Sequence, residues 1–305
     1  MAVITHASLE TDLRMAAVLD QEIAVLLADR SSIRNSGAVT NFGLINGRGS
    51  DTMTIRLAGL DGYDKFSVTA AEDTDVSDTS LTDASVALAV ARYAIRRDLG
   101  DLAELSGFPG SDISVDRLAS SMVGEAEALF MELVGDAITA FGTDKGSKGA
   151  ALSVDNWFDA IATLQTAGNS GRVYALINPQ QLGDLQSSIR AEAGAIQFVA
   201  ATQDQLSVKP AGYAGSFAGV EIFTSKQLEA SGGGYDGGMW AEGCIGYAEA
   251  APLISMGAVQ RPAASPVTIE FQRDASKALT EVVGSYYVGC SIIQDGMGVG
   301  LLSTT

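Results

Sequence analysis

Histidine is nearly absent from this chain, since His6 is the only one among 305 residues. His6 falls in a segment that we expect to form a terminal arm, so a histidine-based catalytic triad is excluded. One histidine also cannot supply a two-histidine metal site. The chain contains neither a Gly-x-Ser-x-Gly nucleophile motif nor a Walker A phosphate loop.

The other candidate sites also lack essential parts. GMGVG (296–300) is followed by no predicted helix, which a dinucleotide site requires. Glu72, Asp73 and Asp75 could attract Ca²⁺, but the glycine and terminal glutamate of a calcium loop are missing. With 37 acidic residues, some carboxylates lie close together by chance. The sequence therefore predicts no catalytic residue, no cofactor-binding residue and no metal ligand.

Cysteines and long apolar runs are also scarce. Cys244 and Cys290 are the only two cysteines, and both lie in apolar surroundings, so we expect buried, reduced thiols rather than a secreted disulfide scaffold. No run of 18 uncharged apolar residues occurs, which argues against a membrane span. The start, MAVITHASLETDLRM, lacks a basic region followed by an apolar run, so we expect no signal peptide.

Basic residues number only 19 against 37 acidic ones. A field of that sign repels phosphate, which argues against an extended nucleic-acid groove. The hydrophobic content of 47% excludes a disordered chain, and the length allows a sizeable core in one large domain or two lobes.

The N-terminal part alternates between periodic and turn-rich segments. Residues 8–30 carry apolar residues near helical spacing, with Ser8 as a cap, and predict either an arm or a docked terminal helix. SSIRNSG (31–37) and GLINGRGSD (43–51) are rich in turn residues. Residues 52–57 alternate between apolar and polar side chains and predict a half-buried strand.

A long loop is expected at about residues 58–84. It includes the acidic run AAEDTDVSDTSLTD, which contains no basic residue. Two alternatives stay open, a solvated loop and a loop that a partner orders. SVALAVARYAI (85–95) follows as a continuous apolar strand or a buried helix, ending on Arg96, Arg97 and Asp98.

The centre of the chain predicts one long helix at 114–141, capped by Ser114 or Asp116 and about 40 Å long. Its apolar face consists of Val115, Leu118, Met122, Leu129, Leu133 and Ala137. TDKGSKGAA (143–151) is expected to be a linker. Ser153 then opens a helix with Trp157, Ile161 and Leu164 inward.

An α/β pattern follows. VYALI (173–177) predicts a buried strand, and Asn178-Pro179 predicts the cap and first residue of another helix, with Leu182, Leu185 and Ile189 on its face. A strand is expected within 215–228, and GGGYDGG (232–238) is expected to be a flexible tip. VTIEF (267–271) and 280–293 predict strands, after which Asp295-Gly296 and GVGLLST predict a closing hairpin.

This order of parts resembles the capsid fold of tailed bacteriophages, often called the Hong Kong 97 fold. RVYALINPQQLGDLQSSI (172–189) is similar to the strand, Asn-Pro and helix of the family's A-domain. GSFAGVEIFTS (215–225) resembles the strand that follows there. EVVGSYYVGCSIIQDGMGVGLLST (281–304) resembles the family's closing strands.

The resemblance implies an α+β fold with five parts. They are an N-terminal arm and helix (1–50), P-domain strands with an extended E-loop (51–113, the loop at about 58–84), a spine helix (114–142), an α/β A-domain (143–265), and a C-terminal β segment that returns to the P-domain (266–305). Arg92, Arg96, Arg97 and Arg117 are candidate counter-charges for a neighbour's acidic loop, and local surface pairing is the alternative for them.

Some family members cross-link an E-loop lysine to a P-domain asparagine, with a glutamate as base. Lys65 stands at the corresponding part of the loop, but no asparagine follows Asn178. We therefore expect no such cross-link.

The implied function is that of a major capsid protein, a structural and non-enzymatic subunit that self-assembles into pentamers and hexamers of an icosahedral head around phage DNA. The implied partners are other copies of the chain, scaffold, portal and decoration proteins, and DNA held without specificity; no membrane or cofactor is implied. Assembly would occur in the host cytoplasm, and the product would be the virion. The alternatives are an encapsulin shell, a carboxylate-based α/β enzyme, and a tail or decoration protein, which the central helices fit poorly.

Overall fold

A computed structural model of the chain describes residues 32–45, 51–58, 83–100, 115–169, 171–191, 198–200, 212–228, 230–251, 253–256, 259–262 and 266–304. The expected helix at 8–30, His6, Lys65, the acidic run up to residue 82 and Ser114 lie outside these residues. The described part is α+β and strand-rich, as expected.

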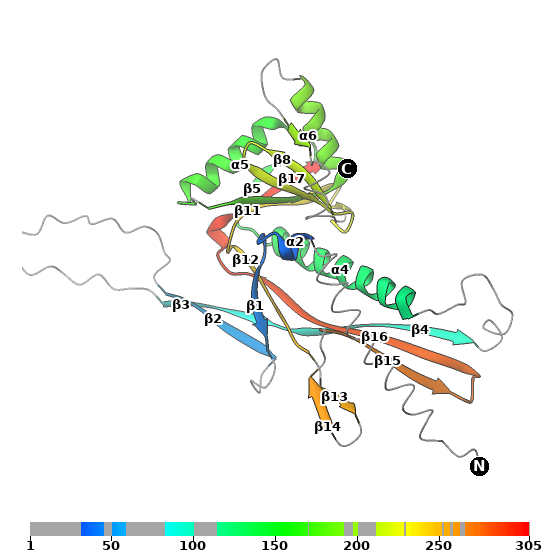
Figure 1. Cartoon of the computed structure of the whole chain (residues 1–305). Coiled ribbons are helices and arrows are strands. Elements are labelled where there is room, and N and C mark those ends of the chain that lie inside the picture. Colours follow the sequence, from blue (N-terminus) through cyan, green and yellow to red (C-terminus); the bar gives the residue numbers. More distant parts are fainter. Residues whose placement is uncertain are drawn as a thin grey trace, which may run out of the picture.

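Two sheets and one long helix organise the molecule (Figure 1). In chain order the elements are α2 (Ser32–Asn35), β1 (Thr40–Leu44), β2 (Thr52–Ala58), β3 (Asp83–Ala89), β4 (Ala91–Gly100), α4 (Val115–Thr139), β5 (Asp144–Gly146), α5 (Val154–Thr166), β6 (Val173–Ile177), α6 (Pro179–Ala191), β7 (Phe198–Ala200), β8 (Tyr213–Phe217), β9 (Val220–Thr224), β10 (Ala230–Ser231), β11 (Gly234–Ala241), β12 (Ile245–Glu249), β13 (Leu253–Met256), β14 (Val259–Pro262), β15 (Val267–Asp274), β16 (Leu279–Ile292), the 3-10 helix η1 (Asp295–Met297) and β17 (Gly298–Thr304).

The first sheet, which we name the long-strand lobe, is built around β16. β4 pairs antiparallel with one side of β16, while β15 and β12 pair with the other side. Tyr287 of β16 accepts a hydrogen bond from the amide of Ala250 and donates one to the carbonyl of Pro266, each 3.2 Å long. β12 and β15 are therefore two parts of one interrupted strand, and the β13–β14 hairpin is inserted between them.

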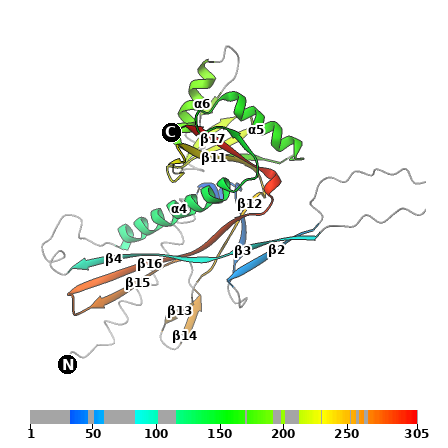
Figure 2. The ribbon, with the colours of Figure 1, turned by 180° about the vertical axis from the view of Figure 1, so that it is seen from behind.

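The second sheet has the strand order β5-β17-β11-β6-β9-β8-β7, with β10 paired to β11. We name it, with α5 and α6, the α/β lobe. Successive side chains of a strand point to opposite faces. Tyr174, Leu176 and Trp240 accordingly pack toward α4, while Ala175 and Met239 pack toward α5 and α6. The helices thus cover both faces of this sheet (Figures 1 and 2).

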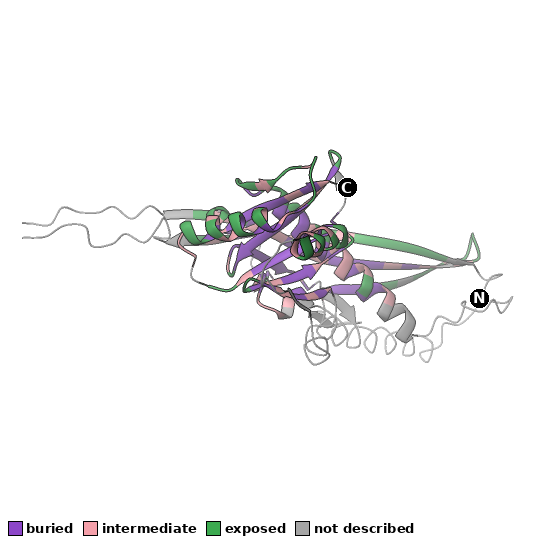
Figure 3. Cartoon of the chain, turned by 90° about the horizontal axis from the view of Figure 1, so that it is seen from above, coloured by how far each residue is buried: buried purple, intermediate pink, exposed green. Residues whose placement is uncertain are grey.

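α4 lies between the two lobes and contributes the largest share of their common core. Its buried residues recur at helical spacing and include Met122, Ala126, Phe130, Val134 and Ile138. The expected long helix is therefore confirmed, but its most buried stripe is rotated: Leu129 and Leu133 are only partly buried. Figure 3 shows that burial concentrates in the sheets and on the inner side of the helices.

The helix signals of the α/β lobe are confirmed in detail. The Ser153 hydroxyl accepts a hydrogen bond from the Asn156 amide at 3.2 Å and caps α5. The Asn178 side chain accepts one from the Gln180 amide at 2.9 Å, directly before Pro179 opens α6. These caps satisfy amides that the first turn of a helix leaves free.

The expected closing hairpin is wrong. β17 pairs with β11 and β5 in the α/β lobe, whereas β16 belongs to the long-strand lobe. The Asp295-Gly296 turn is the 3-10 helix η1, through which the chain crosses between the lobes. The expected ranges 143–265 and 266–305 would place β12 in the α/β lobe and β17 in the long-strand lobe. The strand pairing instead places β12 in the long-strand lobe and β17 in the α/β lobe.

Two glycine-rich segments were also misread. GGGYDGG is not a flexible tip, because Gly234–Ala241 is β11, a strand between β17 and β6. A side chain at Gly238 would collide with Ile138 of α4, so glycine serves close packing there. TDKGSKGAA is not simply a linker, because Asp144–Gly146 forms β5 and pairs in parallel with β17.

The segment 85–95 is extended, but it is neither continuous nor buried throughout. β3 and β4 are separated at Val90, and most of their described side chains are exposed or half-buried in the single chain. Leu88 is fully buried, whereas Ile95 is 39% exposed. Of the two expected forms, a continuous apolar strand and a buried helix, the strand is therefore confirmed, except that it is interrupted at Val90.

Candidate self-assembly surfaces

The described residues offer little for catalysis. Among them, no group of three His, Cys, Asp or Glu side chains could hold a metal ion. One open surface hollow of about 560 Å³ lies beside α5 and is lined by Thr143, Lys145, Asp159 and Thr163 with neighbouring residues. No helix in the described ranges is long and apolar enough to cross a membrane.

The two cysteines lack the thiolate character that catalysis requires. Both are free, Cys244 is buried, and burial raises its pKa. Burial also raises the pKa of Cys290 to about 12. Both groups therefore remain thiols at neutral pH. The expectation of a buried, reduced thiol is confirmed for Cys244, whereas the free Cys290 is only partly buried.

A two-stranded ribbon of β2 and β3 extends from the body of the molecule (Figure 1). Its antiparallel register runs from Thr52 opposite Ala89 to Ala58 opposite Asp83. Met53 and Leu88 pack at its base against Ile45. This ribbon is the stem of the expected long loop, whose residues 59–82 lie outside the described ranges. A two-stranded ribbon is marginally stable in water, so its outer part requires other contacts.

The direction of the ribbon is set where β3 passes into β4. The amide of Val90 donates a hydrogen bond to the carbonyl of Asp51 at 2.9 Å, which closes the base of the ribbon. Gly289 of β16 lies against this break, and a side chain there would collide with the backbone of Ala89. Close backbone approach therefore explains the glycine at this position.

The arginines that follow on β4 have different environments. Arg96 forms ion pairs with Asp98 at 2.8 Å and with Glu281 at 2.6 Å, and its hydrogen bond lowers the pKa of Asp98. Arg97, on the opposite face, pairs with Glu125 of α4. For these two residues the alternative of local pairing is supported.

Arg92 differs from its neighbours. Its guanidinium donates hydrogen bonds of 2.9 and 3.2 Å to the neutral hydroxyl of Ser285. Within the described part of the chain, no carboxylate pairs with it. The positive charge of Arg92 is thus the least compensated of the three described candidates on β4, and the side chain of Arg117 lies outside the described set.

Apolar side chains are exposed at three separate places. Leu44 in β1 is 50% exposed, Phe158 on α5 is 42% exposed, and Ile95 lies on β4. Single exposed apolar side chains are ordinary on a protein surface. They mark possible contact points without defining an interface.

No family model and no curated protein matches the sequence of this chain. Its similarities are structural. The capsid of the Cyanophage P-SCSP1u superposes with a TM-score of 0.53 at 14% identity, covering 88% of this chain and 86% of that one.

Two further solved structures extend the similarity to other kinds of particle. The capsid of a native GTA particle gives a TM-score of 0.57 at 13% identity, covering 90% and 91% of the two chains. The holo-SrpI encapsulin complex from Synechococcus elongatus PCC 7942 gives 0.57 at 12% identity, covering 86% and 84%. The chain has the fold of these shell proteins along most of its length, as the resemblance in sequence implied.

Proposed function

We propose that this chain is a major capsid protein, the structural subunit of the icosahedral head of a tailed phage. The observation that carries the proposal is the match to phage capsid structures over most of both chains. A large insertion or a missing lobe in either chain would leave a large part of one chain without a counterpart in the other. The projecting β2–β3 ribbon adds support, because a two-stranded ribbon is only marginally stable in water without contacts from another element.

In this proposal the subunits associate as pentamers and hexamers in a closed shell. Many weak contacts repeated under closed symmetry give a stable particle while each contact remains reversible. Residues 1–50 would form the arm, 51–113 the P-domain strands and loop, 114–142 the spine helix, and 143–265 the A-domain. By their pairing, β12 joins the P-domain sheet and β17 joins the A-domain sheet; residues 266–297 return to the P-domain.

The remaining partners belong to the same proposal. The acidic net charge of −18 favours a wall that encloses DNA without binding it specifically. Scaffold, portal and decoration proteins would contact the shell, which would assemble in the host cytoplasm and persist in the virion. The role is structural, without catalysis.

An encapsulin is the second candidate, and the similarity to the SrpI complex favours it specifically. The two candidates share the fold and differ in what the shell encloses. Electron microscopy of the expressed full chain tests both, because each predicts hollow shells or capsomer rings. A monomer at high concentration without particles would contradict both. DNA in particles from the natural source would favour the capsid, and an enclosed protein would favour the encapsulin.

A further inference from the structure

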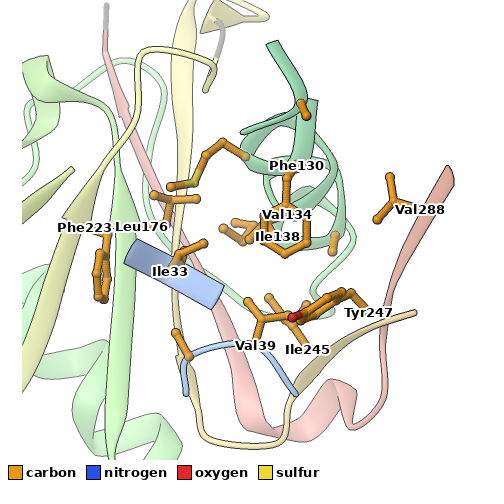
Figure 4. Close-up of a cluster of buried hydrophobic side chains, with 14 of the residues drawn as sticks. Ile33, Val39, Phe130, Val134, Ile138, Leu176, Phe223, Ile245, Tyr247 and Val288 are labelled. Carbon is orange, nitrogen blue, oxygen red and sulfur yellow. The ribbon is translucent and has the colours of Figure 1, made fainter. Parts of the chain in front are cut away.

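Residues 32–39 lie between the two lobes and contact both of them. Ile33 and Ala38 are fully buried, and Val39 is 2% exposed. Figure 4 shows Ile33 and Val39 within one cluster with Phe130 of α4, Leu176 of β6 and Ile245 of β12. A four-residue helix has little stability of its own, so tertiary contacts hold this segment.

The side chain of Arg34 contacts the long-strand lobe and α4. It donates hydrogen bonds to the Glu249 carboxylate of β12 and to the Tyr286 hydroxyl of β16. Its Nε lies 3.7 Å from a carboxylate oxygen of Glu127 of α4. The guanidinium also lies over the ring of Phe130, 4.0 Å from the ring centroid.

The Arg34 guanidinium faces two carboxylates, those of Glu249 and Glu127. Burial alone would lower the pKa of Arg34, but Tyr286, Glu249 and Glu127 more than offset that effect, and the pKa is raised. Burial raises the pKa of Tyr286 as well, so its hydroxyl is neutral and accepts from Arg34 while donating to Glu249 at 3.0 Å. A buried guanidinium requires such partners, and losing one leaves a buried charge.

The backbone of the same segment is bound to the α/β lobe. The Trp240 indole of β11 donates a hydrogen bond to the Ala38 carbonyl at 2.6 Å. The Tyr174 hydroxyl of β6 donates one to the Ser36 carbonyl at 3.1 Å. Gly37, between these two carbonyls, has φ +81°, a conformation that favours glycine. One short segment thus binds two sheets and the helix between them.

The chain itself crosses between the lobes at three points, which gather around η1. They are the α4–β5, β11–β12 and β16–β17 connections. The Ile293 amide donates to the Cys244 carbonyl at 2.7 Å, and the Gly142 amide donates to Asp295 at 3.1 Å. η1 and α2 occupy different places along the junction (Figure 1). Connections gathered near one place can act as a hinge.

We propose that residues 32–39, with Arg34 at their centre, are a clasp that fixes the angle between the two lobes. Without it the lobes would rotate about the crossings at η1. Resting on the proposed shell function, the clasp sets the curvature that each subunit presents to its neighbours.

The direct test measures the distance between the lobes in the full-length protein. Spin labels are placed on cysteines introduced at the exposed positions Asp155 of α5 and Gln272 of β15, in a background with Cys244→Ala and Cys290→Ala. Arg34→Lys keeps the charge but cannot bridge Glu249 and Tyr286 as the planar guanidinium does. We expect the distance distribution to broaden about twofold, as for a released hinge.

Trp240→Phe is a second variant, which removes the hydrogen bond to Ala38 and part of the indole volume while Arg34 keeps its partners, and it should broaden the distribution less. Leu164→Ala is the matched control, because it weakens the core between α5 and the sheet, away from the clasp. If both clasp variants keep the narrow distribution of the parent, or broaden it no more than Leu164→Ala at equal loss of Tm, the clasp is refuted.

Electron microscopy of the same variants separates this inference from the proposed function. If the parent forms shells of one diameter and Arg34→Lys forms shells of several diameters, both the shell function and the effect of the clasp on curvature are supported. A parent that forms no particles contradicts the shell function, whereas the spin-label distances still decide the clasp. Arg34→Lys particles identical in diameter to the parent would refute the effect on curvature.

Discussion

Arg34 shows how much a single buried residue can connect in this protein. It contacts β12, β16 and α4 from a four-residue helix. Sequence inspection interpreted SSIRNSG only as a break, because an arginine in a turn-rich stretch carries no periodic signal. Its role depends on partners more than 90 residues away, which local patterns do not specify.

Gly289 is the residue at which the ribbon stem approaches β16 most closely. Gly289→Ala would place a methyl group against the backbone carbonyl of Ala89, which cannot move aside without displacing β3. We expect a loss of about 1–3 kcal/mol in the free energy of unfolding, measured in urea. Gly183→Ala is the control, since it meets nothing within 4 Å inside α6 and should stabilise the protein by up to about 1 kcal/mol. Equal effects of both changes would contradict this account.

The buried thiols and phenols predict alkaline sensitivity. Burial raises the pKa of Cys290 from 9.0 to about 12, and raises those of Cys244 and Tyr286. A raised pKa means that the folded state holds the proton more tightly. The resulting stability is complete below the unfolded-state pKa and is lost as the pH rises toward the folded-state value.

We therefore expect the free energy of unfolding to fall above about pH 9, by about 1.4 kcal/mol per pH unit for each fully titrating group. Urea unfolding at a series of pH values measures this slope. Cys290→Ala should make it shallower between about pH 9 and about pH 10.5, even though the variant is less stable at pH 7. If the slope is unchanged in that variant, groups other than Cys290 cause the loss of stability at high pH.

Arg92 predicts a specific electrostatic contribution to assembly. The acidic run ends at Asp83, nine residues before Arg92 and about 30 Å from it along an extended chain, and the stem runs away from β4 (Figure 1). We therefore expect Arg92 to receive this run from a neighbouring copy. Arg92→Gln should slow assembly about tenfold at low salt, followed by light scattering, and reduce its dependence on salt.

Arg96→Gln is the matched control, because it removes the same charge from the same strand. Arg96 is already paired with Asp98 and Glu281, so its replacement should affect assembly less. Equal rates for the two variants would mean that only net charge matters.

At the scale of elements, the reliability of a sequence signal depended on how local its cause was. The Ser153 and Asn178 caps act within one turn, and α5 and α6 begin where predicted. Gly238 of β11 has a non-local cause, the close approach of Ile138 of α4, whereas the glycine-rich composition of this segment is typical of a loop. Asp295-Gly296 has the composition of a hairpin turn. β17 nevertheless pairs with β11 and β5 and not with β16, the strand that precedes it in the sequence.

The β2–β3 ribbon predicts the outcome of a deletion. Removing residues 60–80 shortens the segment between the two strands without touching the paired residues Thr52–Ala58 and Asp83–Ala89. We expect soluble, folded subunits that do not form closed shells, as measured by circular dichroism and electron microscopy. Normal particles from this variant would remove the assignment of these residues to a contact between subunits.

At the scale of the whole molecule, the order of parts was predictable, while the division of strands between the lobes was not. The chain crosses the junction three times, and no composition change marks the crossings at β12 and β17. Contacts with other copies were the least predictable, since one chain contains only half of each interface. The candidate basic residues could be named from sequence, but only the structure distinguishes Arg92 from Arg96 and Arg97.

The particle as a whole should be held by non-covalent contacts. No asparagine follows Asn178, so a C-terminal partner for a lysine isopeptide bond is missing. Denaturing mass spectrometry of purified particles should therefore give only the mass of the single chain. A covalent adduct at Lys65 would contradict this expectation.

The interruption between β12 and β15 makes the intervening hairpin an exchangeable unit. Both of its ends are anchored by backbone hydrogen bonds to one residue, Tyr287, so the strand resumes where it stopped. A hairpin of another length or sequence could be grafted between Ala250 and Pro266 while the pairing with β16 stays in register. Repeated once per subunit over a closed surface, that position would give an ordered array for display of a foreign peptide.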